Sequence, residues 1–387
     1  MKKDGGKMEQ FYIKSLTIKK VRHLKDILIP LSENQIKHLI LTGKNGSGKT
    51  SVVEALARYL NKILTGERET AFRNCQKQLD IQFNNKIDSI SERADNYHYI
   101  LAYYEAARIF QAEQPKHVEK VQLKDYYELT EFPRNDFVKY LLDLKMTEAL
   151  ARSKSNTEKA DEIQAWFVKL EQLLKQIFDD ETIELEFDED TFQFHILQQG
   201  KEPFDFNTLS SGYQAVLDIV LDIMMRMQYQ SKRSFVFNLP GIVIIDEIDA
   251  HLHLELQKNI LPFLTTFFPN IQFIVTSHSP FILNSIENVV IFDLENKILV
   301  EHGLNDVPYD GIVEGYFRAD RLSGILKEKF TKYKYLVTKE ELSDDELSEI
   351  AELELYLDEI PDYLAIGITT EYKRIKLDFM NREDIDG

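Results

Sequence analysis

The chain has 387 residues, and its 65 acidic against 47 basic side chains give a net charge of −18. A protein this acidic is not an electrostatic nucleic-acid binder as a whole, so any such contact would need a local basic patch. The single cysteine, Cys75, excludes an intrachain disulfide, and no apolar run approaches the length of a membrane span. The start of the chain also lacks the apolar core of a signal peptide. We therefore expect a cytoplasmic protein without a membrane segment, folded as one large α/β domain or two smaller ones.

The segment from Phe11 to Leu31 carries two strand-like patterns and is the most basic stretch of the chain. Its cationic side chains are Lys14, Lys19, Lys20, Arg22 and Lys25. We expect an edge strand that lysines protect against pairing with other chains. The alternative is a ribbon that faces DNA.

The stretch from His38 to Leu60 has the pattern of a phosphate-binding loop. A short apolar run, Leu39–Leu41, is followed by a match to G-x-x-x-x-G-K-[ST] and then by apolar residues at helical spacing. Glycines let backbone N–H groups point at an anion, and the helix adds the positive end of its dipole. The alternative is a glycine-rich turn without a ligand. The predicted ATP-binding residues are Gly43, Asn45, Gly46, Ser47, Gly48, Lys49, Thr50 and Ser51.

The residue composition of the middle of the chain changes twice. Tyr97–Tyr104 is rich in β-prone residues, whereas the composition from about Gln111 to Asp180 is typical of helices. A β-hairpin is expected after it, between Ile183 and Ile196, with an acidic turn. We interpret residues 111–182 as a helical insertion between two halves of a nucleotide-binding core.

Three further motifs follow the insertion: a Ser-Gly turn from Leu209 to Gln214, an apolar strand that ends in Asp246 and Glu247, and an apolar strand that ends near His278. An Asp at a strand end can complete a Mg²⁺ sphere with the Thr50 hydroxyl, and the following Glu can orient or deprotonate a water. Each motif has a plainer explanation: Ser210 or Ser211 could simply cap a helix, and His278 could be a structural histidine.

The order of these motifs resembles the ABC-type ATPases, in the branch that contains the SMC, RecF and overcoming-lysogenization-defect ATPases. In that resemblance Gly43–Thr50 is Walker A, Leu209–Gln214 the signature, and Ile242–Glu247 Walker B. Asp249 falls where the D-loop begins, and His278 matches the switch histidine. The phrases LAYYEAAR and TSHSPF are similar to stand-alone prokaryotic defence ATPases, including those of the Septu type. The likeness covers roughly residues 10 to 300.

Two departures from the family pattern affect the predicted site. The signature reads LSSGYQ rather than LSGGQ, so Ser211 and Tyr213 replace a glycine and a glutamine, while Ser210 and Gly212 are retained. The Q-loop glutamine is ambiguous, and Gln111 is the best candidate. Other metals are not favoured, since His251 and His253 have no cysteine nearby.

The resemblance implies an α/β P-loop core with a mixed or parallel central sheet, ATP and Mg²⁺ as cofactors, and a dimer that sandwiches two ATP molecules. The expected division is an N-terminal half at 10–110, the insertion at 111–182, a C-terminal half at 183–303, and a helical acidic tail at 304–387. Lys49, Glu247 and His278 would be catalytic, Thr50 and Asp246 would hold Mg²⁺, and Ser210 and Gly212 would act on the partner subunit's nucleotide.

The function that this resemblance implies is an ATPase switch, a homodimer or higher oligomer, that regulates an effector such as a nuclease or toxin in antiphage defence. The main alternative is a RecF-like or SMC-like clamp that associates with DNA. An appended nuclease domain is disfavoured because only 67 residues follow Asp320. A transporter subunit is also disfavoured because of the long insertion.

The C-terminal tail has eleven acidic residues against one lysine between Lys339 and Asp362. Its apolar residues Ile350, Leu353, Leu357 and Ile360 are spaced as one stripe of a helix, which must be buried to be stable. We expect this stripe to pack on the ATPase core. The alternative is a docking helix for a basic partner or a second subunit.

Overall fold

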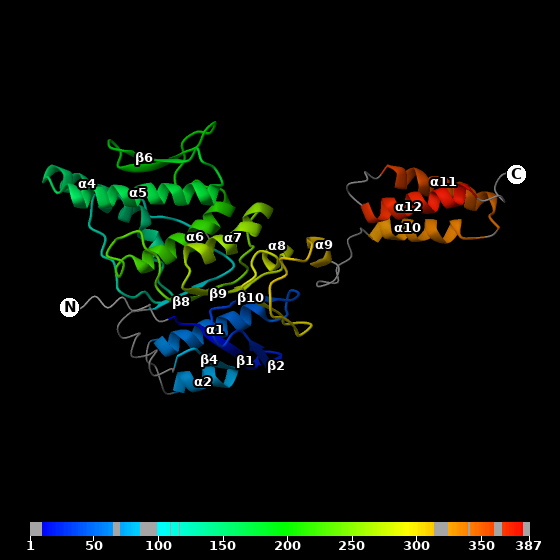
Figure 1. Ribbon diagram of the computed structural model, residues 1–387, viewed down its shortest axis with the longest axis horizontal. Coiled ribbons are helices and arrows are strands. Elements are labelled where there is room, and N and C mark those ends of the chain that lie inside the picture. Colours follow the sequence, from blue (N-terminus) through cyan, green and yellow to red (C-terminus); the bar gives the residue numbers. More distant parts are fainter. Residues whose placement is uncertain are drawn as a thin grey trace. The chain divides into compact units, whose positions relative to one another are not determined.

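The computed structural model describes residues 10–64, 70–85, 99–108, 110–115, 117–312, 324–339, 341–359 and 366–381. The chain forms two compact units, Met1–Tyr309 and Asp310–Gly387, which we describe separately (Figure 1). No helix in these ranges has both the length and the apolar character needed to cross a membrane.

The central sheet of the first unit has six strands in the order β11-β10-β3-β9-β8-β5. All neighbouring strands are parallel except β10 and β11, which are antiparallel. The strands are β3 (His38–Thr42), β5 (Ile100–Tyr104), β8 (Gly241–Ile245), β9 (Ile271–Thr276), β10 (Val289–Asp293) and β11 (Ile298–Val300). Every residue of β3, β8, β9 and β10 is buried, as expected for parallel strands that are covered on both faces. This mixed, mostly parallel sheet confirms the predicted α/β class.

A second, antiparallel sheet has the order β2-β1-β4, with β1 at Ile13–Val21, β2 at Leu24–Pro30 and β4 at Leu79–Phe83. Helix α1 (Lys49–Leu64) lies between the two sheets and contacts strands of both, and α2 (Thr70–Gln78) covers the outer side of this region (Figure 1). The lysine-rich strand β1 is therefore the central strand of its sheet. The prediction of an edge strand in this segment was wrong for β1, because β4, which is distant in sequence, pairs with it, whereas β2 does lie at the edge of the sheet.

The helical region after β5 begins later than its composition predicted. Residues 117–132 form no helix, and a 3₁₀ turn at Pro133–Asp136 leads into α4 (Phe137–Ser153) and α5 (Thr157–Phe178). The carbonyl oxygens of Tyr127, Glu128 and Glu131 accept hydrogen bonds from the side chain of Arg226 instead of taking part in a helix. Tertiary contacts thus override the local helical preference.

The predicted hairpin is confirmed: β6 (Glu184–Asp188) pairs with β7 (Gln193–Leu197). The rest of the first unit comprises α6 (Ser211–Met227), α7 (Leu254–Phe267) and α8 (Pro280–Leu283), and the short α9 (Tyr309–Gly311) begins at its last residue. The division of the ATPase into two halves around residues 111–182 stays a prediction.

The second unit contains α10 (Gly324–Val337), α11 (Asp344–Asp358) and α12 (Ile366–Met380). The stripe residues Ile350, Leu353 and Leu357 are buried against side chains of α10 and α12, among them Tyr333 and Tyr372. The fourth stripe residue, Ile360, lies outside the described residues. The expectation that this stripe packs on the ATPase core was wrong, because the tail helices bury it among themselves.

Candidate nucleotide-binding site

The glycine-rich loop connects β3 to α1, and three of its glycines have positive φ: Gly43 at 129°, Gly46 at 84° and Gly48 at 101°. L-residues rarely adopt such angles, so the loop conformation depends on glycine. Space is also limited at Gly48, where an added Cβ would lie 2.9 Å from the Leu24 side chain. The loop is thus packed against the turn that joins β1 to β2.

Lys49 is the first residue of α1, and its side chain is buried and turned back into the loop. Its Nζ donates to the carbonyl oxygens of Gly43 (2.8 Å) and Lys44 (3.3 Å) and lies 2.5 Å from Nε2 of His278. Burial lowers the pKa of Lys49, whereas the carboxylates of Glu247 and Asp246 act in the opposite direction. Burial and the charge of Lys49 lower the pKa of His278. A neutral His278 can accept a hydrogen bond from the ammonium group through Nε2.

The acidic end of β8 lies beside β9, next to the loop. The buried side chain of Asp246 accepts a hydrogen bond from the hydroxyl of Thr276 (2.6 Å) through Oδ1. The same hydroxyl accepts from the backbone N–H of Glu247 (2.7 Å). Thr276 begins the TSHSPF phrase, but the sequence motifs assigned it no role; it holds the Asp246 carboxylate and the backbone of Glu247 at the carboxyl end of the sheet.

Glu247 has a positive φ of 47°, an unusual conformation for a residue with a side chain. Arg108 stabilises this turn: its guanidinium donates to the carbonyl oxygens of Asp246 (2.8 Å), Glu247 (2.9 Å) and Ile248 (3.2 Å). Such outliers persist only where the surroundings enforce them, and they cluster at functional sites. Arg108, at the end of the LAYYEAAR phrase, is thus a positioning residue for Glu247.

A pocket of about 340 Å³ opens above the loop. It brings together predicted residues of the loop with Glu247 from the end of β8, and its lining residues are Arg22, His23, Asn45, Gly46, Gly48, Lys49, Thr50, Ser51 and Glu247. The sequence motifs missed Arg22 and His23, which come from the turn between β1 and β2. The basic composition of that segment was the available signal. Arg22 thus adds a second cation to Lys49 at this pocket.

The signature turn lies at the start of α6. Ser210 is the N-cap residue by its backbone, but its exposed side chain makes no capping hydrogen bond. Gly212 is buried against the D-loop, where an added Cβ would lie 3.1 Å from the carbonyl oxygen of His251. Tyr213 stacks on Phe178 of α5, with ring centroids 4.3 Å apart. The tyrosine that replaces the family's glutamine therefore joins the signature to the helical region.

Next to the signature, Asn207 forms two hydrogen bonds with the backbone of Ala112, which follows the Q-loop candidate Gln111. The backbone carbonyl oxygen of Asn207 also accepts a hydrogen bond from the side-chain amide of Gln214 (2.9 Å). Gln111 itself is exposed. Its role as the Q-loop residue stays a prediction.

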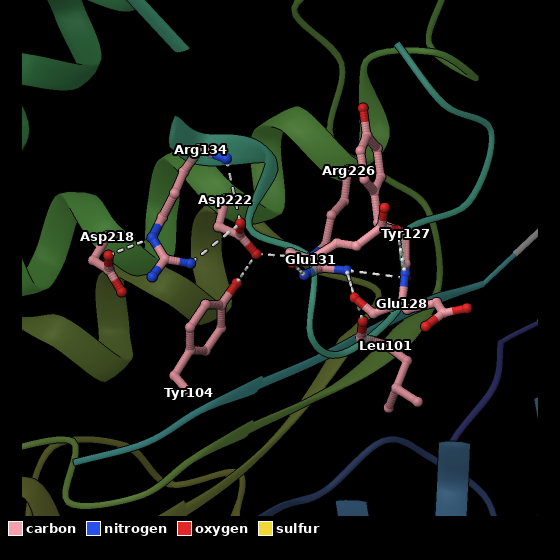
Figure 2. A network of polar contacts seen from close by, with 9 residues as sticks. All are labelled: Leu101, Tyr104, Tyr127, Glu128, Glu131, Arg134, Asp218, Asp222 and Arg226. Atoms are coloured by element: carbon pink, nitrogen blue, oxygen red, sulfur yellow. Dashed lines mark hydrogen bonds and ion pairs between the residues drawn. The ribbon is translucent and has the colours of Figure 1, made fainter. Parts of the chain in front are cut away.

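A buried charge network holds α6 against the sheet (Figure 2). Asp222 accepts hydrogen bonds from Tyr104 of β5 (2.8 Å) and from Arg226 (2.7 Å), while Arg134 forms ion pairs with Asp218 and Asp222. Burial raises the pKa of Asp218 to about 6, although Arg134 opposes this shift. The signature helix is thereby tied to β5, the strand that pairs with β8.

Residues 39–284, well over half of the chain, match a family model described as "AAA domain, putative AbiEii toxin, Type IV TA system". The chain belongs to this family of P-loop ATPases. It is 26% identical to the Septu protein PtuA of Bacillus mycoides over 95% of its own length and 53% of the relative. It is also 35% identical to the Retron Ec83 probable ATPase of Escherichia coli, over 36% of this chain and 26% of the relative. The chain spans about half or less of the length of these curated relatives.

Among solved structures, the ATPase is similar to the SMC head domain from Thermotoga maritima, with 13% identity, a TM-score of 0.37, and coverage of 73% of this chain and 94% of that one. It is also similar to a nucleotide-free ATP-binding cassette from an ABC transporter, with 16% identity, a TM-score of 0.35, and coverage of 76% and 91%. Likeness at this level says nothing about activity.

The residues of the pocket fit a nucleoside triphosphate with Mg²⁺. The loop glycines allow backbone N–H groups to surround an anion, and Lys49 and Arg22 supply positive charge. Two polar atoms near the loop, Ser47 Oγ and Asp249 Oδ1, are buried without a hydrogen-bond partner in the described part of the chain. Buried polar atoms without partners are rare, so these two atoms are suited to hydrogen bonds with a ligand.

Proposed function

We propose that this ATPase binds and hydrolyses ATP with Mg²⁺, dimerises around the nucleotide, and thereby switches a partner effector, a nuclease or toxin, in prokaryotic antiphage defence. The observation that carries this proposal is the convergence of Lys49, Glu247 and His278 on one loop. The effector role is supported by the similarity to the Septu protein PtuA and the retron ATPase.

Each residue has a defined part in this proposal. Lys49 exchanges the carbonyl oxygens of Gly43 and Lys44 for phosphate oxygens when nucleotide binds. Thr50 and Asp246 hold Mg²⁺, which neutralises charge on the phosphates. Glu247 orients or deprotonates the attacking water, in the position that Arg108 enforces.

His278 takes part through Lys49. Its Nε2 accepts a hydrogen bond from the Lys49 ammonium group. When Lys49 turns to phosphate, Nε2 becomes free to interact with the γ-phosphate end of the nucleotide or with the attacking water. His278 thus responds to whether Lys49 is bound to phosphate.

The dimer is supported by the exposed signature. The Ser210 hydroxyl is free of a capping bond at the start of α6, where backbone N–H groups and the helix dipole favour an anion. We propose that Ser210 and Gly212 contact the γ-phosphate held by the other subunit, with Asp249 nearby. Hydrolysis removes this contact and releases the dimer, as in other nucleotide switches.

Mixed dimers test this assembly. Ser210→Arg should bind ATP normally as a monomer but lose turnover, and the matched change Ser153→Arg at the exposed end of α4 should keep it. Mixing Ser210→Arg with Lys49→Ala subunits should restore at most one competent site per mixed dimer. Full ATPase activity of Ser210→Arg alone would show that the turn is only a helix cap.

A further inference from the structure

A groove runs along one side of α5, away from the nucleotide pocket. Two adjoining hollows of about 750 and 730 Å³ form it, and they share Lys169 and Phe235. One hollow lies between α5 and α7 and reaches Tyr213 of the signature. The other reaches the turn 231–236, after α6. We call these two hollows together the α5 groove.

The second hollow is strongly basic, although the protein carries a net charge of −18. Its only acidic lining residue is Glu162, and its cationic lining residues are Lys120, Lys159, Lys169, Lys232 and Arg233. Such a concentration of positive charge in an acidic protein indicates an anionic ligand.

The cations of this hollow fall into two groups. Arg233 donates to the carboxylate of Asp143 (2.7 Å), and Lys120 lies 4.0 Å from the same residue. By contrast, Lys159, Lys169 and Lys232 are exposed and form no ion pair with an acid in the described part of the chain. These three lysines are therefore available to a ligand.

The turn that presents Lys232 is rigidly held. Lys232 and Arg233 both have positive φ, 53° and 63°, which is unusual for residues with side chains. The Ser234 hydroxyl donates to the carbonyl oxygen of Ser231 (2.6 Å), and the Arg233 N–H donates to that of Gln228 (2.9 Å). Backbone strain of this kind is retained where the surrounding structure enforces it.

Aromatic rings line the groove beside the lysines. Phe235, Phe263, Phe267 and Tyr213 are only partly buried, so each offers ring surface to a ligand. The rings of Phe263 and Phe267 are nearly parallel, at an angle of 7°. Amide side chains, Gln172, Gln176 and Asn259, add hydrogen-bonding groups to the same hollow, and its acidic residues, Asp179 and Glu255, leave the phosphates to the basic second hollow.

We propose that the α5 groove binds a single-stranded nucleic acid, DNA or RNA, with phosphates at Lys159, Lys169 and Lys232 and bases against the aromatic rings. Lysines that follow a backbone, combined with rings on which bases stack, are the usual means of binding single strands. A duplex keeps its bases stacked inside and cannot place a base face on rings that lie within a hollow. The groove shares no lining residue with the nucleotide pocket.

Fluorescence anisotropy with labelled 20-nucleotide single-stranded DNA and RNA of one sequence tests the proposal on the full chain. The triple variant Lys159→Glu/Lys169→Glu/Lys232→Glu should bind at least tenfold more weakly. Its slope of log K against log salt should be shallower by about 2, since each phosphate contact on a single strand contributes about 0.7. The matched control Lys20→Glu/Lys77→Glu/Lys297→Glu changes the charge equally at exposed lysines outside the groove.

A second variant tests the stacking. Phe263→Ala should weaken binding by about fivefold or more without changing the salt slope. Thermal melting of every variant checks that it is folded. Equal losses in both lysine variants, tighter binding of the matching duplex than of the single strand, or no binding by the unmodified protein at low salt would each overturn the proposal. Comparison of the DNA and RNA measurements shows which of the two nucleic acids binds more tightly.

Discussion

The ammonium group of Lys49 lies 2.5 Å from Nε2 of His278, although the two residues are 229 positions apart in the chain. β9 lies beside β3 in the sheet, so the loop after one strand meets the histidine that follows the other. The lysine that should hold phosphate is thus in contact with the residue that should sense it.

Lys49→Ala should weaken ATP binding at least tenfold, because charge-assisted hydrogen bonds from its ammonium group to the phosphates are lost. His278→Ala should keep most of the affinity but lose turnover. Isothermal titration calorimetry and phosphate release measure the two effects. Lys44→Ala, at an exposed lysine of the same loop that pairs with Glu295, serves as the control. Unchanged ATP affinity of Lys49→Ala would contradict the assignment of the site.

Glu247→Gln should still bind ATP but hydrolyse it about 10²- to 10⁴-fold more slowly, because the amide keeps the shape and loses the general base. Arg108 bonds to backbone carbonyl oxygens around this residue, so the turn should be unaffected. Single-turnover hydrolysis checks this. A variant with the rate of the unmodified protein would move the catalytic role to another group, with His278 as the first candidate.

Asp222→Asn should destabilise the first unit by about 3–5 kcal/mol, because it leaves the buried Arg226 without a carboxylate partner and removes one of the two carboxylates that pair with Arg134. The thermal transition of the ATPase unit should fall accordingly. Glu189→Gln, in the exposed turn of the β6–β7 hairpin, should change stability by no more than about 0.5 kcal/mol. Equal stability of the two variants would show that the network in Figure 2 contributes little to the fold.

His38 should make the protein less stable in mild acid. Burial lowers its pKa to about 4, and its Nδ1 accepts a hydrogen bond from the N–H of Phe273. Between pH 6.5 and about 4 the unfolded chain binds a proton that the folded chain does not, so stability falls as pH falls. The loss from this group is up to about 1.4 kcal/mol per pH unit. Urea unfolding at several pH values measures this loss. The free energy of unfolding of His38→Asn should change less with pH, because asparagine keeps a hydrogen-bond acceptor but cannot titrate.

The tail should be separable from the ATPase. A chain that ends at Ile312 should keep its ATP affinity and its melting temperature, because the stripe of α11 is buried among the tail helices. A chain that ends at Lys339 should instead aggregate, since it retains Phe330 and Tyr333 of α10 without the helices that cover them. Calorimetric melting and light scattering measure both. A clear loss of stability in the shorter chain would show that the tail supports the ATPase core.

The nucleotide site was predictable from the sequence to the extent that its chemistry is local. Gly43, Gly48 and Lys49 lie within seven residues, and the backbone conformation that they need is specific to glycine. Apolar runs ending in acids likewise indicated β8, because fully buried parallel strands leave a continuous apolar signature.

The sequence could not determine which distant segments contact one another. Thr276 and Arg108 lie in the TSHSPF and LAYYEAAR phrases and Arg22 in a basic segment, but no local pattern gives them a role. Only the strand order and the β1–β2 turn bring them to the site. The same reason explains the wrong predictions for the tail stripe and for β1. The burial of Leu353 and the central place of β1 depend on which distant surfaces pair, and the hydrophobic period shows only that a face must be buried. Local patterns determined the chemistry of the loop, and long-range packing decided which residues support it.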